Sequence, residues 1–228
     1  MGKVMVEKNL IISPTVDGVF AREWVKGDCN FDIILLYYLP DEEGFLELKK
    51  DFKVFRVNSE KWQNIKMFLD ANPNVIEEYD NFWFVDDDIK IDTNSINELF
   101  KIHSEYKLSI SQPAMTGYTT FDILKPQPYI LRYISFVEIM CPLMSKECLK
   151  KLIHTFGITE SGWGLDFYWA KILERKNMAV IDKAIAEHTR PAGYNYDIRF
   201  KQNPAVALND FIREKNLELI IQQYETKS

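Results

Sequence analysis

Short apolar runs rich in β-branched and aromatic residues alternate along this chain with stretches of helical periodicity. This alternation constrains the fold more than any other feature of the sequence. Strands that alternate with helices build a mostly parallel sheet with helices over both faces, so an α/β protein is expected. We predict strands at residues 9–13, 31–38, 52–57, 82–86, 108–114 and 178–182.

Helical periodicity is clearest between the predicted strands. In the first such stretch Trp62, Ile65 and Leu69 recur on one face. Residues 123–140 begin with prolines and continue as a long extended segment, for which we predict an additional strand antiparallel to the main sheet. We predict helices at residues 59–71, 94–105, 145–155, 164–176 and 204–224.

The size and charge of the chain limit its class. With 228 residues, the chain supports one full-sized domain and falls short of two. Its formal net charge of −6 leaves no chain-wide basic stripe, so nucleic acid is not an expected partner. An acidic protein that binds an anion such as a nucleotide diphosphate needs a metal ion or a local arginine cluster at the site.

Cysteine usage and hydropathy indicate a reducing compartment. The three cysteines, Cys29, Cys141 and Cys148, are far apart and form no C-x-x-C pattern, so neither a disulfide framework nor a zinc site is expected. The chain contains no eighteen consecutive apolar residues and no signal-peptide pattern at its start. We therefore expect a cytoplasmic protein without a transmembrane segment, and peripheral membrane attachment through the C-terminal helix stays open.

Three adjacent aspartates end one predicted strand, in the stretch "FWFVDDDIKID". Ligands of α/β sheets bind beyond the carboxyl ends of the strands. Because side chains alternate along a strand, Asp86 and Asp88 are expected on one side, where they form a hard-oxygen site for Mg²⁺ or Mn²⁺. Asp87 is expected to face the other way, toward a ribose or a neighbouring backbone group. The alternative is a solvated turn whose aspartates cap the helix that starts near Asn94.

The stretch "ESGWGLDFYW" combines glycines, an indole and a carboxylate. Gly162 and Gly164 flank Trp163, which predicts a tight loop before a helix, with Asp166 near the first turn of that helix. In a functional reading, Trp163 stacks on a sugar and Asp166 is a general base that deprotonates an acceptor hydroxyl. In a structural reading, Asp166 interacts with the helix dipole and Trp163 fills the core.

A histidine and an arginine follow the last predicted strand, in "AEHTRPAG". His188 could supply a nitrogen ligand to the same metal, and Arg190 could neutralise a diphosphate in bidentate fashion. A lone histidine is more often an ordinary structural residue. Pro191 and Gly193 predict a loop at this point, which keeps an active-site role open.

Two further segments contain isolated candidates. The segment "SPTVDGVFAREW" follows the first strand, where such sheets usually receive a nucleotide, and its polar candidates are Asp17 and Arg22. It contains neither the dinucleotide fingerprint nor the Walker loop. In "FVEIMCPLMS", Glu138 lies within an apolar run, so it is either buried and paired or lines a pocket.

Taken together, these stretches resemble the domain of unknown function 707 family, which looks like a branch of the GT-A glycosyltransferases. The resemblance covers most of the chain and implies a Rossmann-like, three-layer α/β/α fold with a mostly parallel central sheet and an additional antiparallel segment. The matching stretches, in order, are "AREW", "FDIILLYY", "FWFVDDDIKID", "LSISQPA", "LRYISFVEIMCPLMS", "SGWGLDFYW" and "IDKAIAEHTRP".

The resemblance also implies roles for individual residues. Asp86 and Asp88 match the D-x-D carboxylates that hold a divalent cation on the donor diphosphate, and His188 is similar to the C-terminal metal-binding histidine of many GT-A enzymes. Asp166 is similar to the base in the G-W-G-x-E-D segment of inverting galactosyltransferases, although this chain has Leu165 and Asp166 where that pattern has Glu and Asp.

The implied activity is metal-dependent transfer of a sugar from a nucleotide-diphosphate sugar to a hydroxyl acceptor, with Mn²⁺ or Mg²⁺ as cofactor and inversion of the anomeric centre. The acceptor would be a glycan or a lipid-linked glycan, in polysaccharide biosynthesis. A single domain would span residues 1–228, with a nucleotide-sugar-binding half at about 1–115, an acceptor and catalytic half at about 116–203, and a C-terminal helix at 204–228.

One set of candidate residues would contact the nucleotide-sugar donor, and a second set would contact the rest of the substrate. The first set is Asp17, Arg22, Asp87 and Arg190, and the second is Glu138, Trp163 and Gly164. Two other functions stay open on the sequence alone: a metal-dependent phosphoesterase, and a non-catalytic module that binds a nucleotide sugar or a carbohydrate.

Overall fold

The centre of the protein is a mixed β-sheet, seen in a computed structural model that describes residues 7–191 and 201–228. In this part of the chain the strand order is β10-β7-β9-β6-β8-β4-β1-β2-β3, with β5 paired to β9 outside that path. The strands are β1 (Asn9–Thr15), β2 (Phe31–Tyr37), β3 (Lys53–Arg56), β4 (Asn81–Phe84), β5 (Ile89–Lys90), β6 (Ile110–Gly117), β7 (Leu131–Ile134), β8 (Leu143–Ser145), β9 (Met178–His188) and β10 (Gln223–Lys227).

Strand direction decides where the loops that follow the strands lie. Strands β3, β2, β1 and β4 pair in parallel, and β6 pairs in parallel with β9. Strand β8 lies between these two groups and is antiparallel to both β4 and β6, so both groups point the same way. The carboxyl ends of β1, β2, β3, β4, β6 and β9 therefore meet at one edge of the sheet.

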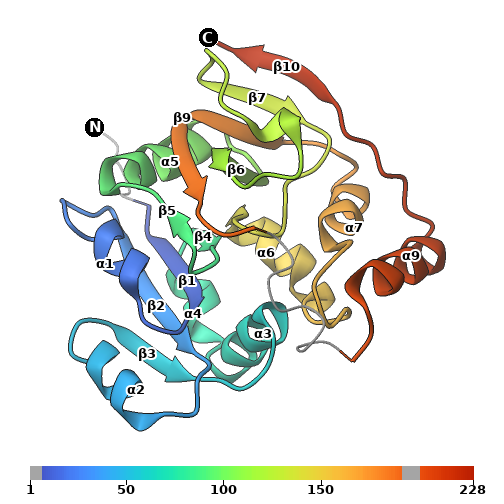
Figure 1. Ribbon diagram of the computed structural model, residues 1–228. Helices are drawn as coiled ribbons and strands as arrows, with labels where there is room; N and C mark the ends of the chain where they lie inside the picture. The colour runs from blue at the N-terminus through green and yellow to red at the C-terminus, as the bar shows by residue number, and fades with distance from the viewer. Residues whose placement is uncertain (1–6, 192–200) are drawn as a thin grey trace.

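Helices cover both faces of the sheet. Helices α1 and α5 contact each other over one face, and α3 and α6 contact strands on the other (Figure 1). No helix in the described residues is both long and apolar enough to cross a membrane. The helices are α1 (Val19–Trp24), α2 (Glu42–Leu48), α3 (Lys61–Ala71), α4 (Asn74–Glu78), α5 (Thr93–Glu105), α6 (Lys146–Leu152), α7 (Leu165–Ile172) and α9 (Pro204–Lys215), with 3₁₀ turns η1 (Asp122–Leu124) and η2 (Ile153–Thr155).

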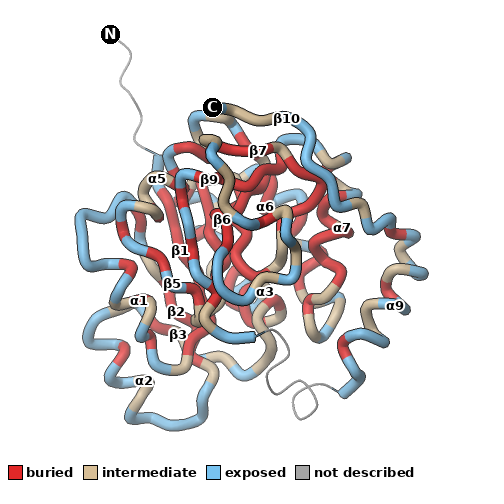
Figure 2. Tube along the Cα trace, turned by 45° about the horizontal axis from the view of Figure 1, so that its top comes forward, coloured by how far each residue is buried: buried red, intermediate tan, exposed pale blue. Residues whose placement is uncertain are grey.

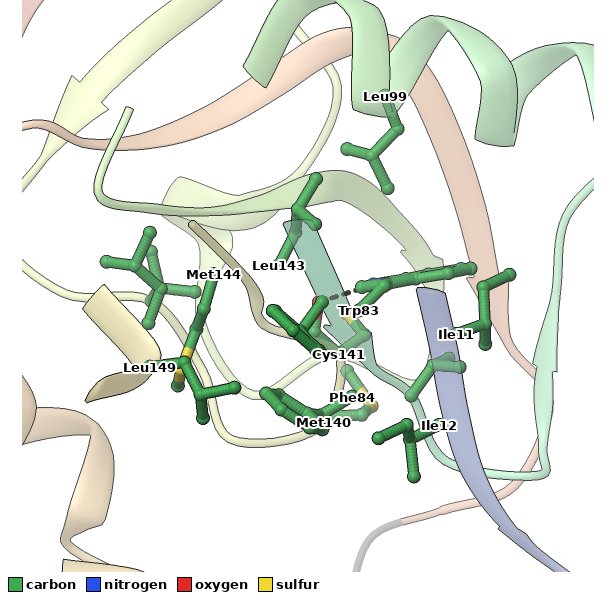
Figure 3. Packing of buried hydrophobic residues seen from close by; sticks show 14 of the residues in the cluster. Ile11, Ile12, Trp83, Phe84, Leu99, Met140, Cys141, Leu143, Met144 and Leu149 are labelled. Carbon is green, nitrogen blue, oxygen red and sulfur yellow. Dashed lines mark hydrogen bonds between the residues drawn. The ribbon is translucent and has the colours of Figure 1, made fainter. Parts of the chain in front are cut away.

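Strand β4 shows how the two core layers are built. Its neighbouring residues Trp83 and Phe84 point to opposite faces, because side chains alternate along a strand. The ring centroid of Trp83 lies 5.9 Å from that of Trp24 in α1, and the centroid of Phe84 lies 5.8 Å from that of Trp62 in α3. The indole N–H of Trp83 donates to the carbonyl of Cys141 at 2.8 Å (Figure 3). Strands β1 and β4 are buried over their whole length, while exposure concentrates in the outer helices and loops (Figure 2).

The α/β fold predicted from the alternating pattern is confirmed, and each of the six predicted strands is present. The extended segment at 123–140 contains β7, which is antiparallel to β9 and β10 as predicted. Helices α1, α2 and α4 were not predicted, because each has only five to seven residues and cannot establish a helical period. The antiparallel strands β5, β8 and β10 were missed as well.

The prediction of a C-terminal helix over 204–228 is wrong for the second part of that range. Helix α9 ends at Lys215, because Asn216 adopts a left-handed conformation with φ of 48° and caps the helix. The chain then forms β10, which pairs antiparallel with β7. A buried guanidinium helps to hold this strand, since Arg132 Nη1 in β7 donates to Gln223 Oε1 at 3.1 Å.

Candidate active site

The acidic triplet lies at the carboxyl edge of the sheet, directly after β4. The chain then doubles back as β5, in which Ile89 pairs with His188 at the end of β9. This pairing brings His188 and Arg190 beside the triplet, although about a hundred residues separate them in sequence. The two stretches of sequence that carry the acidic triplet and His188 therefore meet at one place.

Asp88 is the centre of this cluster. Its Oδ2 lies 3.1 Å from Arg190 Nε and 3.3 Å from His188 Nε2. Its Oδ1 is buried and has no hydrogen-bond partner within the described structure. A buried carboxylate oxygen without a partner is costly, so this atom is available for a ligand.

The tautomer of His188 follows from its second contact. Its Nδ1 lies 2.6 Å from the carbonyl oxygen of Tyr118, and a carbonyl only accepts, so Nδ1 carries the proton. Nε2 then faces Asp88 Oδ2, which requires a proton or a cation shared by the two atoms. Burial lowers the pKa of His188, but the hydrogen bond and charge of Asp88 outweigh burial and raise the pKa above its ordinary value.

The other two aspartates each have a basic partner. Burial raises the pKa of Asp87 to about 6, even though Arg190 Nη2 lies 2.6 Å from its Oδ1. Burial also raises the pKa of Asp86, against the opposing charge of Lys61. For Asp88 the bonds from His188 and Arg190 outweigh burial, and the pKa is lowered. The mutual repulsion of the triplet is thus offset by three basic side chains.

Lys61 is a site residue that the sequence analysis missed. Its Nζ lies 2.7 Å from Asp86 Oδ1, 2.9 Å from the Ile139 carbonyl and 2.7 Å from the Met140 carbonyl. These three oxygens match the three donors of an ammonium group. A signal was present, because Lys61 begins the helix that follows β3 and so had to lie at the carboxyl edge. By the same reasoning Tyr38, which follows β2, reaches Asp87: its hydroxyl lies 3.5 Å from Oδ2.

Asp166 and Glu138 form the second part of the site. Asp166 is 7% exposed at the first turn of α7, and its Oδ1 accepts from the Phe167 N–H at 2.9 Å. Burial raises the pKa of Asp166 to about 7. Burial, followed by the charge of Asp166, raises the pKa of Glu138 to about 7, while His188 has the opposite influence. Glu138 therefore lies within electrostatic reach of Asp166 and of the triplet cluster.

The backbone on either side of Trp163 adopts conformations that require glycine. Gly162 and Gly164 have φ of 79° and 90°, a region that other residues rarely adopt. A Cβ on Gly164 would lie 2.9 Å from Phe211 Cδ1 in α9, so close packing also excludes a side chain there. Trp163 is half-buried, and its backbone N–H donates to Ser161 Oγ at 3.2 Å.

Asp17 and Arg22 lie at the carboxyl end of β1, but their described contacts are local. Asp17 is exposed, and its Oδ1 accepts from the Val19 N–H at 3.0 Å. Arg22 donates to the Asp17 carbonyl at 2.9 Å and to Asp51 Oδ2 at 3.2 Å. No hydrogen bond or ion pair in the described part of the chain joins either residue to the acidic triplet.

The alternative reading of the triplet as a helix cap is wrong. The residue that caps α5 is Asp92, whose side chain accepts from the Ser95 N–H at 3.0 Å. Strand β5 separates the triplet from this cap. The aspartates at 86–88 are thus not needed to start the helix, and another reason for their presence is required.

The cluster fits a divalent cation in chemistry, although residues 7–191 and 201–228 contain no preassembled group of three or more metal-ligating side chains. Asp88 Oδ1 is an unpartnered hard-oxygen donor, and Nε2 of His188 is the ring nitrogen left over by the Tyr118 contact. His188 Nε2 lies 3.3 Å from Asp88 Oδ2, so the two side chains are direct neighbours in the cluster.

Solved structures with the same architecture identify the fold class as GT-A. The structure of S. aureus TarS 1-349 in complex with UDP-GlcNAc superposes with a TM-score of 0.65 at 14% identity, over 93% of this chain and 68% of that chain. The structure of GalNAc-T7 with UDP, GalNAc and Mn²⁺ superposes with a TM-score of 0.63 at 11% identity, over 94% of this chain and 50% of that one. The GT-A fold that the sequence resemblance implied is confirmed.

A family model matches part of the chain. Residues 20–128 match the family model described as "Protein of unknown function (DUF707)". This range includes the acidic triplet and Lys61, but ends before Glu138, Asp166 and His188. No curated protein sequence matches the chain.

Proposed function

We propose that this protein is a metal-dependent glycosyltransferase that moves a sugar from a nucleotide-diphosphate sugar to a hydroxyl acceptor with inversion. The observation that carries the proposal is the meeting of the acidic triplet with His188 and Arg190 at the carboxyl edge of a GT-A fold, within electrostatic reach of Glu138 and Asp166. Two structures of similar fold contain UDP-GlcNAc, or UDP with Mn²⁺, which supports a nucleotide-sugar donor.

Asp86, Asp88 and His188 would hold the divalent cation, Mn²⁺ or Mg²⁺. The unpartnered Oδ1 of Asp88 and the orientation of His188 support this assignment. When bound, a cation at this place supplies positive charge that stabilises a departing diphosphate.

Arg190 is the side chain that we assign to the donor diphosphate. Its guanidinium is 47% exposed and already bonds two carboxylates, Asp87 through Nη2 and Asp88 through Nε. A planar fork of this kind binds two phosphate oxygens equally well. With a cation held at Asp88, Arg190 would be available to bind the diphosphate and Asp87 to contact the ribose.

Asp166 is the base in this proposal. The acceptor oxygen attacks the anomeric carbon from the face opposite the diphosphate, and Asp166 Oδ2 takes the hydroxyl proton. A new carbon–oxygen bond forms as the bond to the diphosphate oxygen breaks, and the electron pair leaves with the nucleoside diphosphate. The pKa of about 7 suits the role, since a base is most effective when its pKa lies near the working pH.

The remaining candidates complete the assignment. Asp17 and Arg22, at the end of β1, would face the nucleoside, and Trp163 with Gly164 would line the sugar side. The donor would occupy the half formed by about residues 1–115 and the acceptor the half formed by about 116–203. The acceptor would be a glycan or lipid-linked glycan of polysaccharide biosynthesis.

A thermal-shift experiment with UDP tests the donor and metal sites. A ligand that binds only the folded state stabilises it by about 2.7 kcal/mol at a hundred times its Kd. We expect UDP to raise the melting temperature only with Mn²⁺, and the Asp88→Asn variant to lose this effect. An equal shift in the variant, or none in the wild type, would contradict the proposal.

Product analysis tests the reaction itself. NMR of the product should show an inverted anomeric centre, and a retained configuration would remove inversion from the proposal. Hydrolysis of phosphomonoesters without sugar transfer would instead identify a phosphoesterase.

A further inference from the structure

Glu138, in the loop after β7, and Asp182, a buried carboxylate of β9, differ in their hydrogen bonds. Asp182 is fully paired: Arg132 donates to its two oxygens at 2.8 and 3.0 Å, and the Gln127 N–H donates to Oδ1 at 2.9 Å. Glu138 Oε2, in contrast, is buried and has no hydrogen-bond partner among the described residues. An unsatisfied buried polar atom opposes folding, so its presence indicates a requirement other than stability.

The backbone around Glu138 is held from two sides. The Glu138 N–H donates at 2.7 Å to Oε1 of Gln112, a fully buried side chain of β6. The two carbonyls that follow, at Ile139 and Met140, accept from Lys61 Nζ. The backbone that carries Glu138 is therefore fixed in place, as is expected of a preorganised ligand-binding group.

The charges that face Glu138 come from four elements. They are Asp166 at the start of α7, His188 at the end of β9, Asp86 after β4 and Lys61 at the start of α3. Asp166 exerts the largest of these charge effects, and it has the same sign as Glu138, so burial and this neighbour together raise the pKa of Glu138 to about 7. A protonated carboxyl has one O–H donor, and a hydroxyl or ring oxygen of a ligand can accept from it.

We propose that Glu138 binds the acceptor: its unpartnered Oε2 forms a hydrogen bond with the hydroxyl adjacent to the one that Asp166 deprotonates. The acceptor is then a compound with adjacent hydroxyls, such as a sugar ring, and not a simple alcohol. This inference rests on the proposed function, because it places Glu138 beside the base of the transfer reaction. It assigns Glu138 to acceptor recognition and not to the donor or the metal.

A kinetic comparison of two variants tests the role. With UDP-GlcNAc, Mn²⁺ and a panel of methyl glycosides as acceptors, Glu138→Leu should raise KM for the acceptor on the order of tenfold. KM for the donor should stay unchanged. Glu138→Gln keeps a donor at the same position and should keep the acceptor KM within about threefold of the wild type. A rise in donor KM alone, or equal losses in both variants, overturns the assignment.

Thermal unfolding of the ligand-free protein tests the same inference without turnover. Glu138→Leu should raise the melting temperature, because it removes an unsatisfied buried carboxyl, whereas Asp182→Leu, the control, should lower it by leaving Arg132 unpaired. A Glu138→Leu variant that melts below the wild type or fails to fold shows a structural role and overturns the proposal. Transfer by the wild type together with an unchanged acceptor KM in Glu138→Leu overturns the role of Glu138 alone, whereas no transfer by the wild type to any acceptor overturns the proposed function and this role with it.

Discussion

Replacing Asp166 by asparagine is expected to stabilise the protein and to stop sugar transfer. The carboxyl is almost fully buried, and burial raises its pKa from an ordinary value of 3.8 to about 7. The folded state therefore holds the proton more tightly than the unfolded state. As pH rises above 3.8, the carboxyl ionises in the unfolded chain but stays protonated in the folded protein. The free energy of unfolding therefore falls with pH until pH passes the folded-state pKa of about 7.

The size of this loss of stability follows from the difference between the folded and unfolded pKa, because one pKa unit corresponds to about 1.36 kcal/mol. Burial of the Asp166 carboxyl thus lowers the free energy of unfolding by about 1.6 kcal/mol at pH 5 and by about 4 kcal/mol at pH 8. Asparagine is uncharged at both pH values and can still accept from the Phe167 N–H through its Oδ1. Loss of the carboxylate at the start of α7 opposes the gain by about 0.3–1 kcal/mol. The variant should thus be about 3 kcal/mol more stable than the wild type at pH 8 and gain far less at pH 5.

Urea denaturation of both proteins at pH 5 and pH 8 measures these differences. Calorimetry with UDP and Mn²⁺ should show donor binding within a few fold of the wild type, because Asp166 is assigned to the acceptor side. The reasoning would be refuted by a variant that is less stable than the wild type at pH 8, or by a gain that does not grow with pH. Near-normal turnover in the variant would remove Asp166 from the mechanism.

Three further outcomes are expected. Arg190→Gln should weaken UDP binding in calorimetry about tenfold or more, since it removes charge-assisted hydrogen bonds to the diphosphate, and unchanged affinity would contradict this role. Lys61→Met should lower the affinity for Mn²⁺, because Asp86 loses the group that orients it. Lys66→Met, in the same helix but paired with Asp70, is the matched control and should leave that affinity unchanged. Gly164→Ala should cost about 1–3 kcal/mol in urea denaturation, because φ of 90° and the contact with Phe211 both exclude a Cβ, and a variant as stable as the wild type would argue against this strain.

Much of the architecture could be predicted from local patterns. Each predicted strand was a β-branched or aromatic run, and such runs are buried here whichever neighbours they pair with. Because these strands alternate with helices, parallel pairing was expected, and the carboxyl ends of parallel strands share one edge of the sheet. For that reason Asp86, Asp88 and His188 could be placed in one site before any contact was known.

The elements that were missed depend on partners elsewhere in the chain. Strand β10 forms because Asn216 ends α9 and because β7 offers an open edge to pair with, with Arg132 reaching Gln223 across it. Nothing in the polar sequence of β10 indicates a strand by itself. Short helices such as α2 likewise depend on the surfaces they cover.

The sequence by itself determined the residue types at the sheet edge: an acidic triplet after one strand, a histidine and an arginine after another, and a carboxylate in the first turn of a helix. Only the tertiary structure decided how they are paired. Lys61 holds Asp86, and Arg190 spans Asp87 and Asp88. Glu138 lies within electrostatic reach of Asp166 and has no ion pair among the described residues. The physical reason is that strand ends are set by local periodicity, whereas charge pairing and burial arise between segments as far as 103 residues apart.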